Sequence, residues 1–167
     1  MADELNVGDK VISQAHFAGV IEGIETKVVS GLKLRFYIVR ILQSNVKIMV
    51  PTENLGSSQL RRPISRQEVE QIYRILATPD SLPSEGNAER WNTRYQRYKA
   101  VLATGSLLEI AGLLKSLHRR KETTGLALGE TRFLETAMDC LVGEVMSAGR
   151  MQAEAVRREI ELRLEVA

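Results

Sequence analysis

The segment Arg61-Arg62-Pro63-Ile64-Ser65-Arg66-Gln67-Glu68 separates two different sequence patterns. Before it, apolar and polar residues alternate and turn residues are frequent, which is typical of short β-strands. After it, apolar residues recur every three or four positions, which is typical of helices with one packed face. We therefore predict an α+β protein of two domains, residues 1–62 and residues 63–167.

The N-terminal part predicts four or five short antiparallel strands. In Leu34-Arg35-Phe36-Tyr37-Ile38-Val39-Arg40-Ile41-Leu42, β-branched and aromatic residues alternate with arginines, as in a strand with one buried face. Turn residues flank it at 28–31 and 43–45. The other expected strands are residues 10–13, 19–24 and 46–50, and Pro51 ends the last of them. Strands of this length and number predict a small curled sheet or barrel.

The C-terminal part predicts an all-α bundle of about five helices. Ser65 with Glu68 has the spacing of a capping box, and Ser106 with Glu109 repeats it. Residues 79–87 hold two prolines, two serines and a glycine, and therefore predict a loop. The expected helices are residues 65–76, 89–103, 106–122, 129–147 and 151–165.

Composition and motifs exclude several classes of function. Cys140 is the only cysteine and His16 and His118 are the only histidines, none of them at metal-ligand spacing. Phosphate-binding loops, dinucleotide-binding glycine motifs and nucleophile elbows are absent from the sequence. We therefore predict a protein that is not an enzyme, with no catalytic residues, no metal and no cofactor.

The expected location is the cytoplasm. The acidic N-terminus has no apolar run behind it, so no signal peptide is predicted. No stretch approaches the roughly 20 apolar residues that span a bilayer, so no membrane contact is expected. Nothing in the sequence demands more than a monomer.

Positive charge is concentrated in residues 90–121, although the net charge is only +2. This range has eight Lys or Arg and one acid, Glu109. Its first ten residues, Arg90-Trp91-Asn92-Thr93-Arg94-Tyr95-Gln96-Arg97-Tyr98-Lys99, hold the only tryptophan and two of the four tyrosines. Cations beside flat aromatic surface suit a phosphate backbone with bases next to it. The segment therefore predicts contact with nucleic acid.

Trp91 has two interpretations. Trp91, Tyr95, Tyr98 and Leu102 share one helical face, and such a stripe by itself favours a place in the core. Trp91 also stands in the first turn after a long loop, where a side chain can protrude between Arg90 and Arg94. An exposed indole there could wedge against a base step in the minor groove.

A second basic group, His118-Arg119-Arg120-Lys121, ends the third expected helix. Cations at a helix C-terminus are favourable by about 0.3–1 kcal/mol each, which is a sufficient structural reason for them. The alternative is contact with phosphates, which the first basic segment makes more plausible.

The chain resembles the CarD/CdnL family of bacterial transcription regulators over nearly its whole length. The resemblance is carried by an ordered set of short motifs: Val7-Gly8-Asp9-Lys10-Val11, Gly23-Ile24-Glu25-Thr26, Phe36 to Leu42, Ile48-Met49-Val50-Pro51, Trp91-Asn92-x-Arg94-Tyr95, Gly105-Ser106, Gly125-Leu126-x-Leu128-Gly129-Glu130 and Leu141-Val142-Gly143-Glu144. The N-terminal part is also similar to the polymerase-interaction domain of the transcription-repair coupling factor.

This resemblance implies an N-terminal Tudor-like barrel that binds the RNA polymerase β subunit. It also implies a helical domain that meets promoter DNA at the upstream edge of the transcription bubble, with little sequence specificity. The family's tryptophan, matched by Trp91, acts as a wedge in the minor groove and stabilises the open complex. A protein with these contacts would be associated with the nucleoid through polymerase.

The resemblance and the two basic groups together give the expected site residues. The DNA-binding set is Trp91, Arg90, Arg94, Arg97, Arg119, Arg120, Lys121 and Arg132. The polymerase-binding set is Lys27, Lys47, Ile48, Met49, Val50 and Pro51, where an exposed strand could extend the partner's sheet. The alternative for the two lysines is that they are charges that protect a sheet edge.

Three departures from the family pattern bear on function. Ser13-Gln14-Ala15-His16-Phe17 replaces a Tyr-Pro-x-x-Gly turn, and Thr93 and Thr131 stand where basic residues occur in other members. We therefore expect weak affinity for DNA alone. Two other functions remain open: an adaptor on RNA polymerase without a wedge, and a freestanding DNA-binding protein, against which the near-neutral charge argues.

Overall fold

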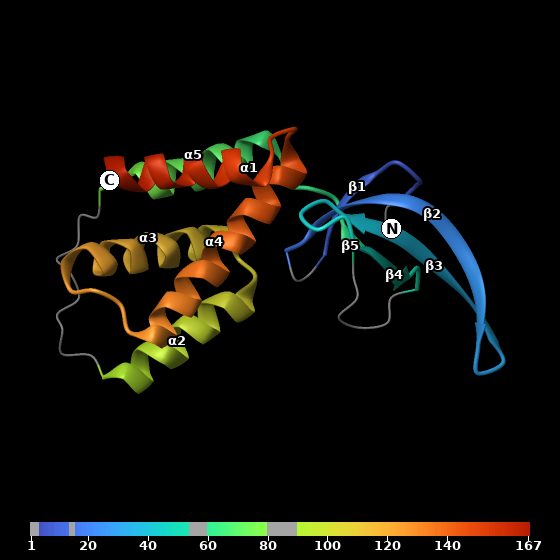
Figure 1. The fold of residues 1–167 in the computed structure, drawn as a ribbon, viewed down its shortest axis with the longest axis horizontal. Helices are drawn as coiled ribbons and strands as arrows, with labels where there is room; N and C mark the ends of the chain where they lie inside the picture. Colours follow the sequence, from blue (N-terminus) through green and yellow to red (C-terminus); the bar gives the residue numbers. More distant parts are fainter. Residues whose placement is uncertain (1–3, 14–15, 54–59, 80–89) are drawn as a thin grey trace. The chain divides into compact units, whose positions relative to one another are not determined.

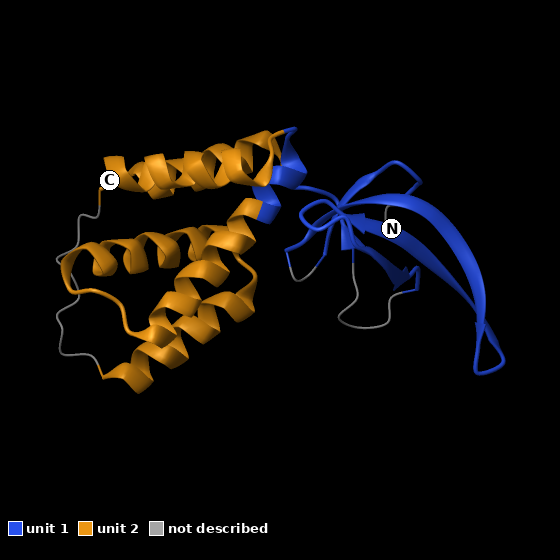
Figure 2. Ribbon diagram, viewed as in Figure 1, with its two compact units in different colours: residues 1–64, 143–150 blue, residues 65–142, 151–167 orange. Residues whose placement is uncertain are grey.

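The computed structural model describes residues 4–13, 16–53, 60–79 and 90–167. Contacts divide the chain into two compact units (Figure 2). The first, here the sheet unit, is residues 1–64 with 143–150. The second, the helical unit, is residues 65–142 with 151–167. The domain boundary that the sequence indicates after residue 62 remains a prediction.

Five antiparallel strands form the sheet (Figure 1). They are β1 (Lys10–Ser13), β2 (Ala18–Val29), β3 (Leu32–Ile41), β4 (Lys47–Pro51) and β5 (Leu60–Arg61), in the order β4-β3-β2-β1-β5. The predicted α+β layout is confirmed. The sheet is not closed into a barrel, however, because β4 and β5 lie at opposite edges and do not pair with each other in the described part of the chain. With two residues, β5 offers few hydrogen bonds for closure.

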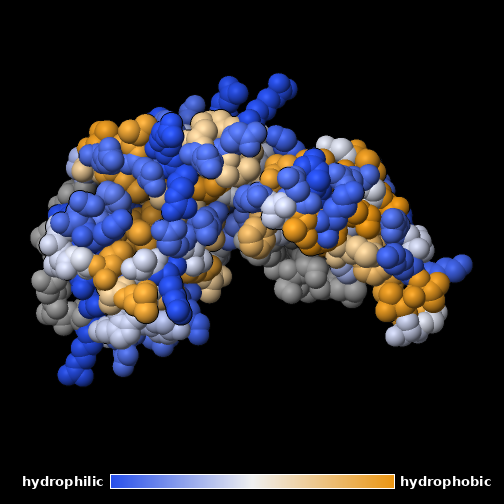
Figure 3. Space-filling model, viewed as in Figure 1, coloured by the Kyte–Doolittle hydropathy of each residue, from blue (hydrophilic) through white to orange (hydrophobic). Residues whose placement is uncertain are grey.

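The β2–β3 hairpin is longer than the sequence predicted. Ser30 and Gly31 both have positive φ angles, 53° and 82°, which suits the two-residue turns that match strand twist. Pairing continues outward to Val29 and Leu32, although the side chains of residues 24–29 are exposed. Figure 3 shows apolar surface at the hairpin tip, where Val28, Val29 and Leu32 are exposed.

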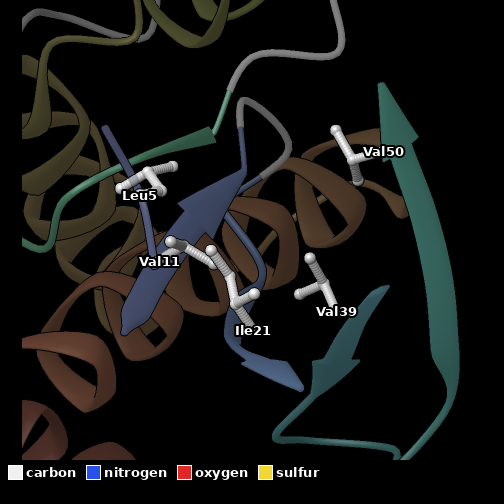
Figure 4. Close-up of a cluster of buried hydrophobic side chains, with 5 residues drawn as sticks. All are labelled: Leu5, Val11, Ile21, Val39 and Val50. Carbon is white, nitrogen blue, oxygen red and sulfur yellow. The ribbon is translucent and has the colours of Figure 1, made fainter. Parts of the chain in front are cut away.

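One face of the sheet carries a small aliphatic core. Its buried members come from the N-terminal segment and four strands (Figure 4), namely Leu5, Val11, Ile21, Val39 and Val50. Tyr37, Ile48 and Leu60 pack against them and are partly buried. The alternation of strand residues thus places Tyr37 and Val39 inward and leaves Phe36 and Ile38 on the other face.

The sheet unit also contains the last part of a helix. Glu144 is fully buried, with His16 Nδ1 2.7 Å from its Oε1 atom, although the two residues are 128 positions apart. Arg61 of β5 forms an ion pair with the same oxygen. Lys10 Nζ donates a hydrogen bond of 2.6 Å to the carbonyl of Gly149. Residues 143–150 are therefore fixed to the sheet by polar contacts.

Five helices follow the strands in the described part of the chain, as predicted. They are α1 (Arg66–Ala77), α2 (Trp91–Thr104), α3 (Leu107–Thr123), α4 (Leu128–Ala148) and α5 (Ala153–Val166). In the helical unit α1 packs on α3 and α5, and α2 packs on α3. Apolar side chains at helical spacing fill the interior, among them Ile72, Leu114 and Ile160. Most of the loop predicted at residues 79–87, and Gln14 and Ala15 of the altered first turn, lie outside the described residues.

The two predicted capping boxes have different outcomes. At α1 the Ser65 hydroxyl accepts a hydrogen bond from the Glu68 amide, and the Glu68 carboxylate accepts one from the Ser65 amide at 2.7 Å. At α3 the Ser106 hydroxyl accepts from the Glu109 amide, so half of the box forms. The Glu109 carboxylate instead accepts from the Thr104 hydroxyl at 2.9 Å, because that hydroxyl lies at the end of α2.

Replacing Ser65 by alanine is expected to lower the free energy of unfolding by about 1 kcal/mol, since the hydroxyl that accepts from the Glu68 amide and donates to the Glu68 carboxylate is lost. Denaturant unfolding followed by circular dichroism measures this. Ser116→Ala is the matched control, because Ser116 is exposed within α3 and alanine is the better helix former there. Equal losses for the two variants would contradict the role of the cap.

Candidate functional site

Trp91 is the first residue of α2 and is partly packed and partly exposed, with 37% of its surface accessible. Its indole lies against the backbone of Gly129 in α4, where an added Cβ would be 2.8 Å from the ring atom Cζ2. Tyr95 meets the indole edge to face, with ring centroids 5.9 Å apart. One part of the indole therefore rests on α4, and the rest of the side chain is exposed to solvent.

The aromatic stripe of α2 changes from exposed to buried along its length. Tyr95 is 39% exposed, whereas Tyr98 is only 3% exposed. Both rings contact Phe133 of α4, at centroid distances of 5.5 Å and 5.4 Å. Burial raises the pKa of the Tyr98 phenol, and the negative charge of Glu130 adds to this. Tyr98 therefore supplies the core anchor, and Trp91 stands at the exposed end.

Glu130 is a buried carboxylate, 1% exposed, at the start of α4. Its Oε2 atom accepts a hydrogen bond from the Ala127 amide at 3.0 Å. Its Oε1 atom accepts one from Arg94 Nε at 3.0 Å, and Arg120 Nε of α3 forms an ion pair with it at the same distance. The Arg94 guanidinium also lies over the indole of Trp91, 5.6 Å from the ring centroid. We call Trp91, Arg94, Arg120, Gly129 and Glu130 the Trp91 cluster.

The cations of the predicted DNA-binding set fall into two groups. Arg94 and Arg120 belong to the Trp91 cluster and are largely covered, and Arg97 is half-buried over the Tyr98 ring. The exposed members are Arg90, Arg119, Lys121 and Arg132. The second group has side chains that solvent, and therefore phosphates, can reach.

Glu130 and Gly129 were not among the predicted site residues. The motif Gly125-Leu126-x-Leu128-Gly129-Glu130 is visible in the sequence, but it gives no sign of what it touches. Arg94 and Glu130 are 36 positions apart, so no local spacing could have paired them.

The predicted polymerase-binding residues lie on and beside an edge strand. β4 pairs only with β3 among the described strands, which leaves its other side available for pairing. Val50 belongs to the sheet core and Ile48 packs against that core, so these two side chains face inward. Met49 lies on the opposite face and is 40% exposed, with Lys27 Nζ 3.5 Å from its sulfur. We call Met49, Lys27 and the backbone of β4 the edge-strand face.

Lys47 is exposed and already paired within the chain. Its Nζ atom lies 3.0 Å from a carboxylate oxygen of Glu22, and Arg40 Nε donates to the other oxygen at 2.6 Å. Hydrogen bonds from Lys47 and Arg40 hold the pKa of Glu22 below its ordinary value. Lys47 is thus the first residue of the edge strand, and its charge is already paired with Glu22 before a partner binds.

Two family models match the chain in adjoining segments. The model "CarD-like/TRCF RID domain" matches residues 5–64, which include all five strands. The model "CarD, C-terminal domain" matches residues 71–161, more than half of the chain. The chain belongs to the CarD family. The resemblance seen in the sequence motifs is therefore confirmed, and the N-terminal part is an RNA polymerase interaction domain of the CarD type.

A relative agrees with this assignment. The Bacillus subtilis (strain 168) protein named "Putative transcription factor YdeB" is 29% identical over 142 residues, which cover 83% of this chain and 88% of that protein. Its name describes a transcription factor, which agrees with the CarD family models. None of the helices in the described ranges is long and apolar enough to cross a membrane.

Proposed function

We propose that this CarD-family protein binds the β subunit of RNA polymerase through its sheet unit and stabilises the promoter open complex through its helical unit. Trp91 acts as a wedge in the minor groove at the upstream edge of the bubble. The observation that carries the proposal is the position of Trp91, exposed at a helix end and seated against Gly129.

The surroundings of Trp91 support contact with DNA. Minor-groove proteins insert apolar side chains between base steps and surround them with cations that neutralise phosphates. Arg90 is exposed at the N-cap of α2, directly before Trp91, and Arg132 is exposed on α4, which carries Gly129. Arg94 and Arg120 serve a different purpose in this proposal: they hold the Trp91 cluster together and add positive potential behind the indole.

The sheet unit supports the polymerase part of the proposal. Along one side of β4 the backbone pairs with no other described strand, and the exposed thioether of Met49 lies beside it, a combination suited to the addition of a strand from a partner. The exposed apolar residues Val28, Val29 and Leu32 enlarge the surface at the hairpin tip, and exposed apolar patches of this kind mark interaction sites.

The proposed mechanism is a shift in an equilibrium. A protein that contacts the open complex better than the closed complex favours opening, by about tenfold for each 1.4 kcal/mol of difference. Binding to polymerase raises the local concentration of the helical unit at the promoter. A weak and unspecific DNA contact is then sufficient, which agrees with a net charge of only +2.

Met49→Glu is expected to weaken binding to RNA polymerase by about tenfold or more, because a charged carboxylate would replace the apolar thioether in the interface, and burying a charge is costly even beside Lys27. Titration of the polymerase with labelled protein measures the change. Val7→Glu is the matched control, since Val7 is an exposed apolar residue of the same unit outside the edge-strand face.

Equal affinity of the two variants would contradict the edge-strand face. Binding to polymerase without any effect of the unaltered protein on promoter opening would instead favour the adaptor function. Tight, salt-dependent binding to duplex DNA without polymerase would favour the freestanding DNA-binding protein.

A further inference from the structure

We infer that Glu130 is a positioning residue for Trp91, which it holds through Arg94, and that Gly129 is the surface on which the indole rests. This inference rests on the proposed function only where it concerns promoter opening. The position of the indole itself is a property of the free protein and is tested separately.

The start of α2 needs support from another element. Arg90 is the N-cap of this helix, and its side chain makes no capping hydrogen bond. Trp91 is the next residue, so it stands in a helical turn that lacks the usual local fixation. The contacts that hold this turn come from α4, through Gly129 and Glu130.

Glu130 fixes the guanidinium of Arg94. A buried carboxylate is unfavourable unless donors and opposite charges surround it. Glu130 accepts hydrogen bonds from the Ala127 amide and Arg94, and Arg120 adds a positive charge beside it. Only 13% of the Arg94 side chain is exposed, so its guanidinium is held between the carboxylate and the indole. A cation fixed over a ring face attracts the ring and restricts its orientation.

Gly129 fixes the ring from the side of α4. A Cβ at this position would lie 2.8 Å from Cζ2 and 2.9 Å from Cη2 of Trp91. These distances are shorter than any ordinary carbon contact, so an alanine would force the indole or the helix start to move. Two adjacent residues of α4 therefore position the ring: Gly129 is the surface under it, and Glu130 holds the Arg94 cation over it.

The fixed orientation of the indole lowers the entropic cost of binding to DNA. A side chain that is already ordered in its binding orientation loses little conformational entropy when it inserts into DNA. Without Glu130, the indole of Trp91 would occupy more than one orientation. Its effect on the lifetime of the open complex would then decrease, although its exposed apolar surface would be unchanged.

The test uses the full-length protein and the fluorescence of its only tryptophan. Glu130→Gln removes the charge with little change of shape, Gly129→Ala intrudes on the ring, and Arg94→Lys keeps the charge but removes the planar group. We expect each to change the emission of Trp91 and to increase its quenching by acrylamide. Glu144→Gln is the matched control, because Glu144 is also a buried, ion-paired carboxylate of α4 but belongs to the sheet unit.

The functional readout is the lifetime of the promoter open complex. We expect Glu130→Gln to shorten it by about threefold to tenfold, the factor that corresponds to the loss of one cation–π contact. In a Trp91→Ala background the same substitution is expected to have no further effect, because Glu130 acts through Trp91.

Unchanged emission and quenching in folded Glu130→Gln and Gly129→Ala proteins would overturn the inference. An equal loss of lifetime with and without Trp91 would also overturn it. If Glu130→Gln does not fold, Gly129→Ala and Arg94→Lys decide by the same fluorescence measurement. If Trp91→Ala leaves the lifetime unchanged, the proposed function fails, while the fluorescence still decides whether Glu130 positions the ring.

Discussion

Replacing Trp91 by alanine is expected to shorten the lifetime of the promoter open complex by about tenfold or more. Unstacking of a base step is worth a few kcal/mol, and an inserted indole offsets that cost only while it is present. Each loss of about 1.4 kcal/mol in the stability of the open complex corresponds to a factor of ten. Dissociation of preformed complexes after addition of a competitor measures the lifetime.

Two controls separate the wedge from a general loss of structure. Leu162→Ala removes an exposed apolar side chain from α5 of the same unit, 50% accessible, and is expected to have no effect on the lifetime. Trp91→Ala itself is expected to bind polymerase normally and to unfold cooperatively, because the buried anchor of α2 is Tyr98. A collapse of the near-ultraviolet signal of the tyrosines would show that Trp91 is needed for the core instead.

Gly143→Ala is expected to lower the free energy of unfolding by about 3 kcal/mol, the upper end of the usual cost of overpacking. An added Cβ would overlap the carbonyl oxygen of His16, which is backbone and cannot turn aside. His16 already has a positive φ angle of 60°, a conformation that is uncommon for residues other than glycine and leaves little freedom for adjustment. The contact lies within the sheet unit, next to the buried Glu144.

The matched control is the same substitution in another helix. Gly112 lies within α3, and a Cβ there would meet no atom of the described structure within 4 Å. Gly112→Ala is therefore expected to stabilise the protein by about 0.5–1 kcal/mol, since alanine is the better residue in a helix. Denaturant unfolding compares the two. A Gly143→Ala protein as stable as Gly112→Ala would contradict the attachment of residues 143–150 to the sheet.

Local patterns were sufficient to predict most of the elements. Ser65 marks the start of α1 because its hydroxyl satisfies a backbone amide, a contact that depends only on near neighbours. The strand around Tyr37 is visible because one side of it is buried in the core. The outer part of β2, residues 25–29, is exposed on both faces and held by backbone pairing with β3. It therefore has no pattern of burial to recognise.

Contacts between distant residues could not be predicted in this way. Eight basic residues in the range 90–121 look alike in the sequence, yet Arg94 and Arg120 meet Glu130, whereas Arg90 is exposed. Which cation is internal depends on how α2, α3 and α4 pack. The attachment of Glu144 to His16 and Arg61 has the same origin, because it joins residues far apart in the chain.

The proposed wedge is tested most directly by the lifetime of an open complex on a promoter that melts unfavourably, measured with bacterial RNA polymerase saturated with this protein and without it. The proposed wedge predicts a longer lifetime with the protein, because Trp91 would insert into the minor groove only in the open complex. An unchanged lifetime, with the protein shown to be bound to the polymerase, would contradict it.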